Sequence, residues 1–189
     1  MILLLDNFDS FTYNLLDYIQ QLGLQCEVLR NDVSIESIEK KDYKAIIFSP
    51  GPGKPSNSGI MPELIKKYHD KIPLLGICLG HQAIGEFFGA TLEKAPVPVH
   101  GKISIIETCM DDLFKNLPSS FNVVRYHSLV LTNLPPELLI IAKTLNRQIM
   151  AIKHKKYPCY GIQFHPEAYL TEFGLDILRN WANLYKLIG

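Results

Sequence analysis

The sequence predicts an α/β fold: a doubly wound, mostly parallel sheet with flanking helices and an antiparallel, strand-rich edge. Short unbroken apolar runs alternate with amphipathic segments over the first hundred residues, as in sheets whose strands are buried on both faces. The links between these segments are short, which favours β-α-β units. From about Lys102 onward strand patterns follow one another, and this change predicts the antiparallel edge.

The first half of the chain predicts alternating strands and helices. The expected strands are the apolar runs at 2–5, 45–48 and 74–77, together with a second strand at about 26–30. The expected helices are one capped by Asp9, Ser10 or Thr12 and ending at Leu22 before Gly23, a weak one at 35–40, one opening at Pro62, and one at 81–88 closed by Gly89. Each helix falls between two strands, as a doubly wound sheet requires.

The second half predicts mainly strands. They are expected at 102–108, 121–124, 138–142, 149–153 and 160–164, with a short helical segment near 111–115. A closing helix is expected at 171–187, with Phe173, Ile177, Trp181 and Leu184 on one apolar stripe. We find no repeat or dividing linker in the sequence, so we expect residues 1–189 to form a single domain.

Composition narrows the function. Of the 189 residues 47% are hydrophobic, which is enough for a buried core without disulfides or metal. Lysine plus arginine and aspartate plus glutamate both number 19, so we expect neither nucleic acid nor a membrane as partner. The four cysteines are far apart in the sequence, which favours a reducing cytoplasm and speaks against a zinc site. The amino terminus resembles a strand rather than a signal peptide or a membrane span.

Gly76-Ile-Cys-Leu-Gly80 follows an apolar strand and precedes a helix, which is the context of a nucleophile elbow. Glycines on both sides allow the sharp turn, and the positive end of the helix favours a thiolate at Cys78. The backbone N–H of Leu79 is a candidate oxyanion donor. The alternative, a buried core cysteine, remains the interpretation for Cys26, Cys109 and Cys159.

His165 follows a predicted strand, and Glu167 comes two residues later. Positions i and i+2 of an extended chain face the same side, so both side chains could enter one site. His165 could then exchange a proton with Cys78 while Glu167 orients the ring. Other histidines stay open as alternatives at this stage: His69, His81, His100, His127 and His154.

Three motifs together resemble the class I (triad) glutamine amidotransferases, a flavodoxin-like fold. They are Ser49-Pro-Gly-Pro-Gly53, Gly76-Ile-Cys-Leu-Gly-His-Gln82 and Gln163-Phe-His-Pro-Glu167. Three further segments narrow the resemblance to the amidotransferase subunits of anthranilate synthase and aminodeoxychorismate synthase: Asp6–Asn14, His100–Lys102 and Arg125–Leu129. Ala168 departs from the family, which usually has serine after His-Pro-Glu.

The resemblance implies roles for individual residues. Cys78 would be the nucleophile, His165 the general base and Glu167 its orienting carboxylate. The glutamine pocket and oxyanion hole would be formed by Gly51, Pro52, Gly53, Leu79, Gln82, Ser128 and Leu129. No cofactor or metal is implied.

The resemblance also implies a partner. The chain would hydrolyse L-glutamine through a γ-glutamyl thioester and deliver ammonia to a chorismate-binding synthase subunit (component I type), serving tryptophan or folate synthesis. Asp9, Ser10, Tyr13 and His100 are interface candidates. We expect nothing in this chain to bind chorismate, and low glutaminase activity without the partner. The alternatives are a cysteine hydrolase acting on other γ-glutamyl amides and a catalytically silent regulatory subunit.

Overall fold

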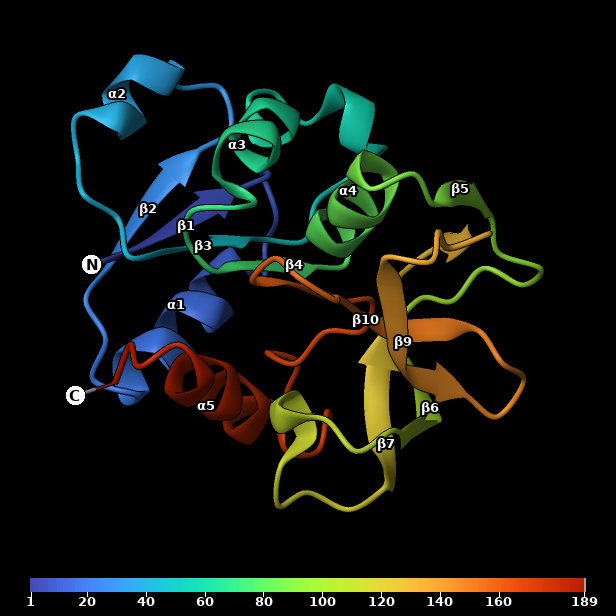
Figure 1. Ribbon diagram of the computed structural model, residues 1–189. Helices are drawn as coiled ribbons and strands as arrows, with labels where there is room; N and C mark the ends of the chain where they lie inside the picture. The colour runs from blue at the N-terminus through green and yellow to red at the C-terminus, as the bar shows by residue number, and fades with distance from the viewer. Residues whose placement is uncertain (189) are drawn as a thin grey trace.

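The computed structural model describes residues 1–188, within which a nine-stranded mixed sheet lies between two layers of helices (Figure 1). In spatial order its strands are β2 (Cys26–Arg30), β1 (Ile2–Asp6), β3 (Ala45–Phe48), β4 (Leu74–Ile77), β11 (Cys159–Ile162), β10 (Ile149–His154), β9 (Leu138–Thr144), β6 (Lys102–Thr108) and β7 (Ser120–Arg125). A separate two-stranded sheet pairs β5 (Thr91–Lys94) with β8 (Leu129–Thr132). The predicted fold class is confirmed.

The large sheet has two halves. In the parallel half, which comprises β2, β1, β3, β4 and β11, all neighbouring strands run in the same direction. In the antiparallel half, which comprises β10, β9, β6 and β7, neighbouring strands run in opposite directions, and β10 joins this half to β11. The predicted antiparallel edge is therefore four strands wide.

Helices cover both faces of the parallel half, as Figure 1 shows. On one face lie α1 (Thr12–Gln21) and α5 (Gly174–Leu184), whose buried side chains share one core cluster with β1, β3, β4 and β11. On the other lie α2 (Ile35–Glu39), α3 (Met61–Tyr68) and α4 (Leu79–Phe87), which form a second cluster. Two 3-10 turns complete the structure, η1 (Pro55–Asn57) and η2 (Asp112–Phe114).

Several boundaries differ from the prediction. Helix α4 begins directly after Cys78, which is its N-cap, rather than at residue 81. Helix α5 begins at Gly174, because Phe173 adopts a left-handed conformation with φ 60° and is its N-cap, outside the helical stripe. Strands β5 and β8 were not predicted. Their short segments pair only with each other, across about forty residues of sequence.

The strand order of the parallel half reverses direction beside β1, since the chain adds β2 on one side and then β3 and β4 on the other. In open α/β sheets, ligands bind at the carboxyl ends of the strands next to such a switch point. The loops that follow β1, β3 and β4 meet there. Across residues 1–188, the structure has no helix with the length and apolar character needed to span a membrane.

Candidate active site

Cys78 occupies a strained turn between β4 and α4. Its φ is 50° and its ψ is −95°, a conformation that costs a non-glycine residue about 1–3 kcal/mol. The turn is held because the Cys78 backbone N–H donates to the Ile162 carbonyl at 2.7 Å. A Cβ on Gly76 would lie 2.3 Å from the Gly80 backbone, and a Cβ on Gly80 would lie 2.6 Å from the Phe48 Cβ. The backbone therefore approaches itself here as an elbow requires.

His165 and Glu167 form a buried pair after β11. The His165 Nδ1 atom lies 2.6 Å from Glu167 Oε1, and the two side chains are 3% and 0% exposed. The His165 backbone N–H donates to the Val124 carbonyl at 3.0 Å, which ties the loop to β7. The predicted same-side arrangement of these two residues is therefore present in the structure.

The environment of the His165 ring favours its protonated form. Burial by itself would lower the pKa of this imidazole, but the nearby Cys78 and the hydrogen bond with Glu167, together with the charges of both groups, outweigh burial and raise the pKa to about 10. This direction of shift favours an imidazolium in the ring that contacts the Glu167 carboxylate. Such a cation beside the sulfur favours the thiolate, which is the nucleophilic form of cysteine.

Cys78 and His165 open into one cavity of about 380 Å³ at the carboxyl ends of the parallel strands. The loop after β3 contributes Gly51 and Pro52 to its wall. Gly51 lies against the elbow, since a Cβ there would be 2.8 Å from Leu79 Cδ2. The other lining residues are Phe8, Asp9, Ser10, Phe11, Pro50, His100 and Tyr126. Three of the four residues predicted as interface candidates, Asp9, Ser10 and His100, thus line the cavity.

Gly53, Gln82, Ser128 and Leu129, which were also predicted for the pocket, are not among the residues that line the cavity. Gly53 is exposed, with φ 78°. Gln82 is 3% exposed, and its Nε2 donates to the Leu129 carbonyl and to Gln163 Oε1, both at 3.2 Å. Ser128 is exposed, and its carbonyl accepts a hydrogen bond from the Ala95 N–H.

The other histidines differ in their location relative to the cavity that contains the Cys78 sulfur. His100 lines the same cavity as Cys78. His81 is fully buried on α4, and burial lowers its pKa to about 3. His127 accepts from the Arg125 Nε at 3.0 Å. His69 and His154 stack in a separate cluster with Phe88 and Tyr157.

Sequence reasoning missed several residues that shape the site. Phe11 and Tyr126 pack edge-on against the His165 ring, with centroids 5.5 and 5.1 Å away, and such rings exclude water from an imidazole. The Thr171 hydroxyl donates to the His165 carbonyl at 2.7 Å and accepts from the Val124 N–H at 2.9 Å. It ties down the loop in which Ala168 replaces the usual serine. Phe11 and Tyr126 lie within the segments Asp6–Asn14 and Arg125–Leu129, which carry the family resemblance, and this was the available signal.

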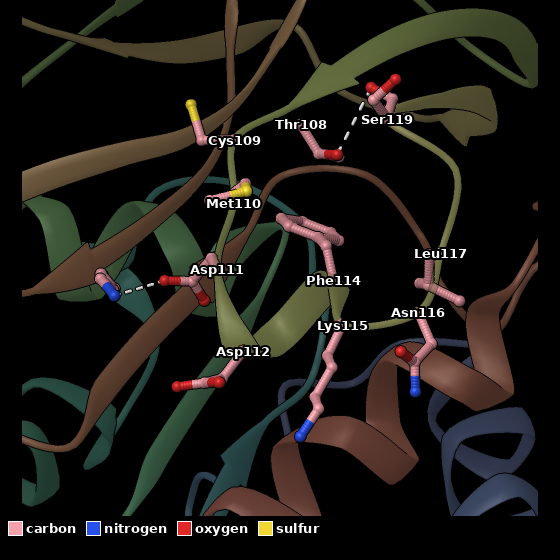
Figure 2. A pocket seen from close by; sticks show the side chains of 11 residues that line it. Thr108, Cys109, Met110, Asp111, Asp112, Phe114, Lys115, Asn116, Leu117 and Ser119 are labelled. Atoms are coloured by element: carbon pink, nitrogen blue, oxygen red, sulfur yellow. Dashed lines mark hydrogen bonds and ion pairs between the residues drawn. The ribbon is translucent and has the colours of Figure 1, made fainter.

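A second cavity, of about 520 Å³, lies beside η2 and is lined by Cys109 (Figure 2). In Figure 2 the Cys109 sulfur points away from the carboxylates of Asp111 and Asp112. No histidine is among its lining residues, all of which belong to the described part of the chain. This cavity therefore offers no base to its thiol. Within residues 1–188, no cluster of three or more histidine, cysteine, aspartate or glutamate side chains is arranged to hold a metal ion.

The fold and the elbow with its buried imidazole and carboxylate define an enzyme of the cysteine-dependent amidotransferase kind. The sequence matches the family model described as "Glutamine amidotransferase class-I" over residues 3–184. The chain belongs to this family, and the resemblance expected from its motifs is confirmed.

Individual relatives agree with this assignment. The chain is 48% identical to "Anthranilate synthase component 2" of Cyanophora paradoxa, over 97% of this chain and 98% of that protein. It is 43% identical to "Aminodeoxychorismate/anthranilate synthase component 2" of Bacillus subtilis, over 98% and 97%. A solved structure from Thermoplasma acidophilum, provisionally described as part of a GMP synthase, superposes with a TM-score of 0.88 at 29% identity, over 98% and 93% of the two chains.

Proposed function

We propose that this chain is the glutaminase component of a chorismate-aminating synthase. It hydrolyses L-glutamine and passes the ammonia to a chorismate-binding partner that makes anthranilate, 4-amino-4-deoxychorismate or both. The observation that carries the proposal is that Cys78 and His165 line one cavity while Glu167 contacts the His165 ring from within the protein. The names of the relatives, both synthase component 2 proteins, support the choice of partner.

The reaction follows from the charges in the site. The Cys78 thiolate attacks the side-chain amide carbon of glutamine, and the His165 imidazolium gives its proton to the departing nitrogen, which leaves as ammonia. A γ-glutamyl thioester remains. The now neutral His165 takes a proton from water, which attacks the thioester, and glutamate leaves as the thiolate is restored. Glu167 keeps the ring in one orientation through its 2.6 Å contact with Nδ1.

The oxyanion formed in both steps requires donors that are already in place. We assign this role to the backbone N–H groups of Gly51 and Leu79, because the two residues lie against each other beside Cys78. The amino-acid end of glutamine would be bound by Gly53, Gln82, Ser128 and Leu129. Pro52 shapes the wall between these regions.

The partner would dock over the mouth of the cavity. Asp9 and Ser10 follow β1 at that mouth, and Tyr13 is 66% exposed on α1. Covering this opening would keep ammonia away from solvent and complete the site, which explains why we expect low activity from the isolated chain. The proposal includes a single domain over residues 1–189 and a cytoplasmic location, which suits the four free cysteines.

Co-purification with the chorismate-binding synthase from the native cell tests the proposal. The complex should release ammonia from glutamine and aminate chorismate, and Cys78→Ser should reduce glutamine-dependent product by about 10³-fold or more. Added ammonia should still support the partner's reaction. Cys109→Ser, at an exposed thiol outside the site, is the matched control and should retain full activity.

The same assay separates the alternatives. A cysteine hydrolase of other γ-glutamyl amides would act on γ-glutamyl peptides with or without the synthase. A silent regulatory subunit would bind the synthase but release no ammonia, and either result would overturn the proposal.

A further inference from the structure

Gln163 reaches the reacting sulfur from inside the protein. It follows β11 and is fully buried, at 0% exposure. Its Nε2 atom lies 3.5 Å from Cys78 Sγ and donates to it. Its backbone N–H donates to the Met150 carbonyl at 2.8 Å, which fixes the residue to β10. The sulfur thus lies near a side-chain amide as well as an imidazolium.

The orientation of the Gln163 amide is set by its neighbours. The Leu129 carbonyl can only accept, so the Gln82 group 3.2 Å from it must be the NH₂ group. The same NH₂ lies 3.2 Å from the Gln163 amide, which must therefore present its oxygen to Gln82. The NH₂ of Gln163 is left facing the sulfur. The reverse orientation would bring two NH₂ groups together.

A buried cation anchors the far end of this chain of hydrogen bonds. Arg125 is 5% exposed and can only donate, so its Nε makes His127 Nε2 an acceptor, at 3.0 Å. The proton of neutral His127 then resides on Nδ1, which donates to the Leu129 carbonyl at 2.9 Å. That carbonyl is fixed from one side by His127 and holds Gln82 from the other. Through Arg125, the antiparallel half thereby helps to orient the Gln163 amide so that its nitrogen faces Cys78 Sγ.

We propose that Gln163 is a further catalytic residue, whose side-chain N–H donates to Cys78 Sγ and stabilises the thiolate before it attacks the substrate. A hydrogen bond to a charged acceptor is stronger than one to a neutral acceptor, so the bond favours the thiolate over the thiol. Gln82 positions the Gln163 amide and does not itself touch the sulfur. This inference rests on the proposed role of Cys78 as nucleophile.

Alkylation of the isolated full-length chain by iodoacetamide tests this, because it reports on the thiolate without partner or glutamine. Mass spectrometry of the peptides measures Cys78 and the exposed Cys109 in the same sample. Burial raises the pKa of Cys26 and of Cys159 to about 12, so neither competes at neutral pH. Gln163→Met should slow Cys78 alkylation at neutral pH by about tenfold. The deficit should disappear at strongly alkaline pH, where the thiol ionises without help.

Gln163→Glu is a second variant, since a carboxylate oxygen still accepts the bond from Gln82 but repels the thiolate. It should slow the reaction at neutral pH at least as much as Gln163→Met. Gln21→Met, at an exposed glutamine on α1, is the control and should react like the wild type. Unchanged rates in both Gln163 variants, or a deficit of equal size at every pH, would refute the role of Gln163. Slow wild-type Cys78, no faster than Cys109, would instead refute the proposed nucleophile.

Discussion

The parallel and antiparallel halves of the large sheet contribute differently to the site. The reactive groups follow parallel strands: Cys78 comes after β4, and His165 and Glu167 come after β11. Tyr126 and Leu129 come from the antiparallel half and from the small sheet beside it, and they pack against or hold the reactive residues. Under the proposed function, one half would supply the reacting groups, and the other would enclose and orient them.

The two halves meet along the paired strands β11 and β10, and the loop after β11 makes a further contact with β7. Ile162 pairs with both β4 and β10, the Gln163 N–H donates to β10, and the His165 N–H donates to β7. Thr171 continues this contact with Val124. The catalytic loop is therefore held from both sides. Substitutions in the parallel half should therefore mainly lower kcat, and substitutions in the antiparallel half should mainly raise KM for glutamine.

The largest effect is expected for Glu167→Gln in the parallel half. The loss of charge and of correct ring orientation should reduce kcat of the complex by about 10²-fold or more. Because Glu167 helps to raise the His165 pKa to about 10, its removal should also shift the alkaline limb of the pH–rate profile toward neutral pH. The profile of glutamine hydrolysis measures both effects.

Glu172→Gln is the matched control. This exposed carboxylate belongs to the same loop and accepts a bond from the Asn122 N–H, away from the imidazole. It should leave rate and profile nearly unchanged. An alkaline limb that stays in place in Glu167→Gln would show that this carboxylate does not hold the proton on His165.

The parallel half was also the more predictable one from sequence. Its strands at 45–48 and 74–77 were predicted to the residue, because a strand buried on both faces is an unbroken apolar run. The partly buried strand at 26–30 was also predicted. Strands β5 and β8 have no such run and exist through pairing with each other. The elbow could be anticipated from two glycines around a cysteine. The contact of Gln163 with the sulfur could not, since it depends on Gln82 and on a carbonyl far along the chain.

A smaller effect, on substrate binding, is expected for Arg125→Met in the antiparallel half. The guanidinium donates to Ser104 and Gln148 as well as to His127. Its loss should loosen the Leu129 carbonyl and the pocket beside it, so KM for glutamine should rise by about tenfold. Because the Gln163 amide is then less firmly oriented, kcat should also fall, by about threefold. Steady-state kinetics of the complex separate the two constants.

Lys143→Met is the control for Arg125→Met, because its exposed side chain lies on β9 of the same half. It should leave KM unchanged. If Arg125→Met instead lowered kcat as strongly as Glu167→Gln, the division of roles between the halves would be wrong.

The smallest effect concerns folding stability at mildly acidic pH. Two histidines with lowered pKa values are buried, His127 near the antiparallel half and His81 on α4 beside the parallel half. Burial and, to a smaller extent, the nearby Arg125 charge lower the pKa of His127 to about 4. The unfolded chain takes up a proton near pH 6.5 while the folded chain does not, so folding stability falls as pH drops from about 6.5 toward 4. His127→Gln does not titrate. From pH 7.5 to 5.5 the variant should lose about 1 kcal/mol less than the wild type.

Urea unfolding at the two pH values measures this difference. His81, with a pKa lowered to about 3, remains in the variant, so part of the acid sensitivity should persist. His100→Gln is the control, since its exposed ring at the cavity mouth should leave the slope with pH close to that of the wild type. Equal slopes for wild type and His127→Gln would mean that His127 takes up its proton in the folded state. In that case Nδ1 and Nε2 would both carry protons, and Arg125 could no longer donate to this ring.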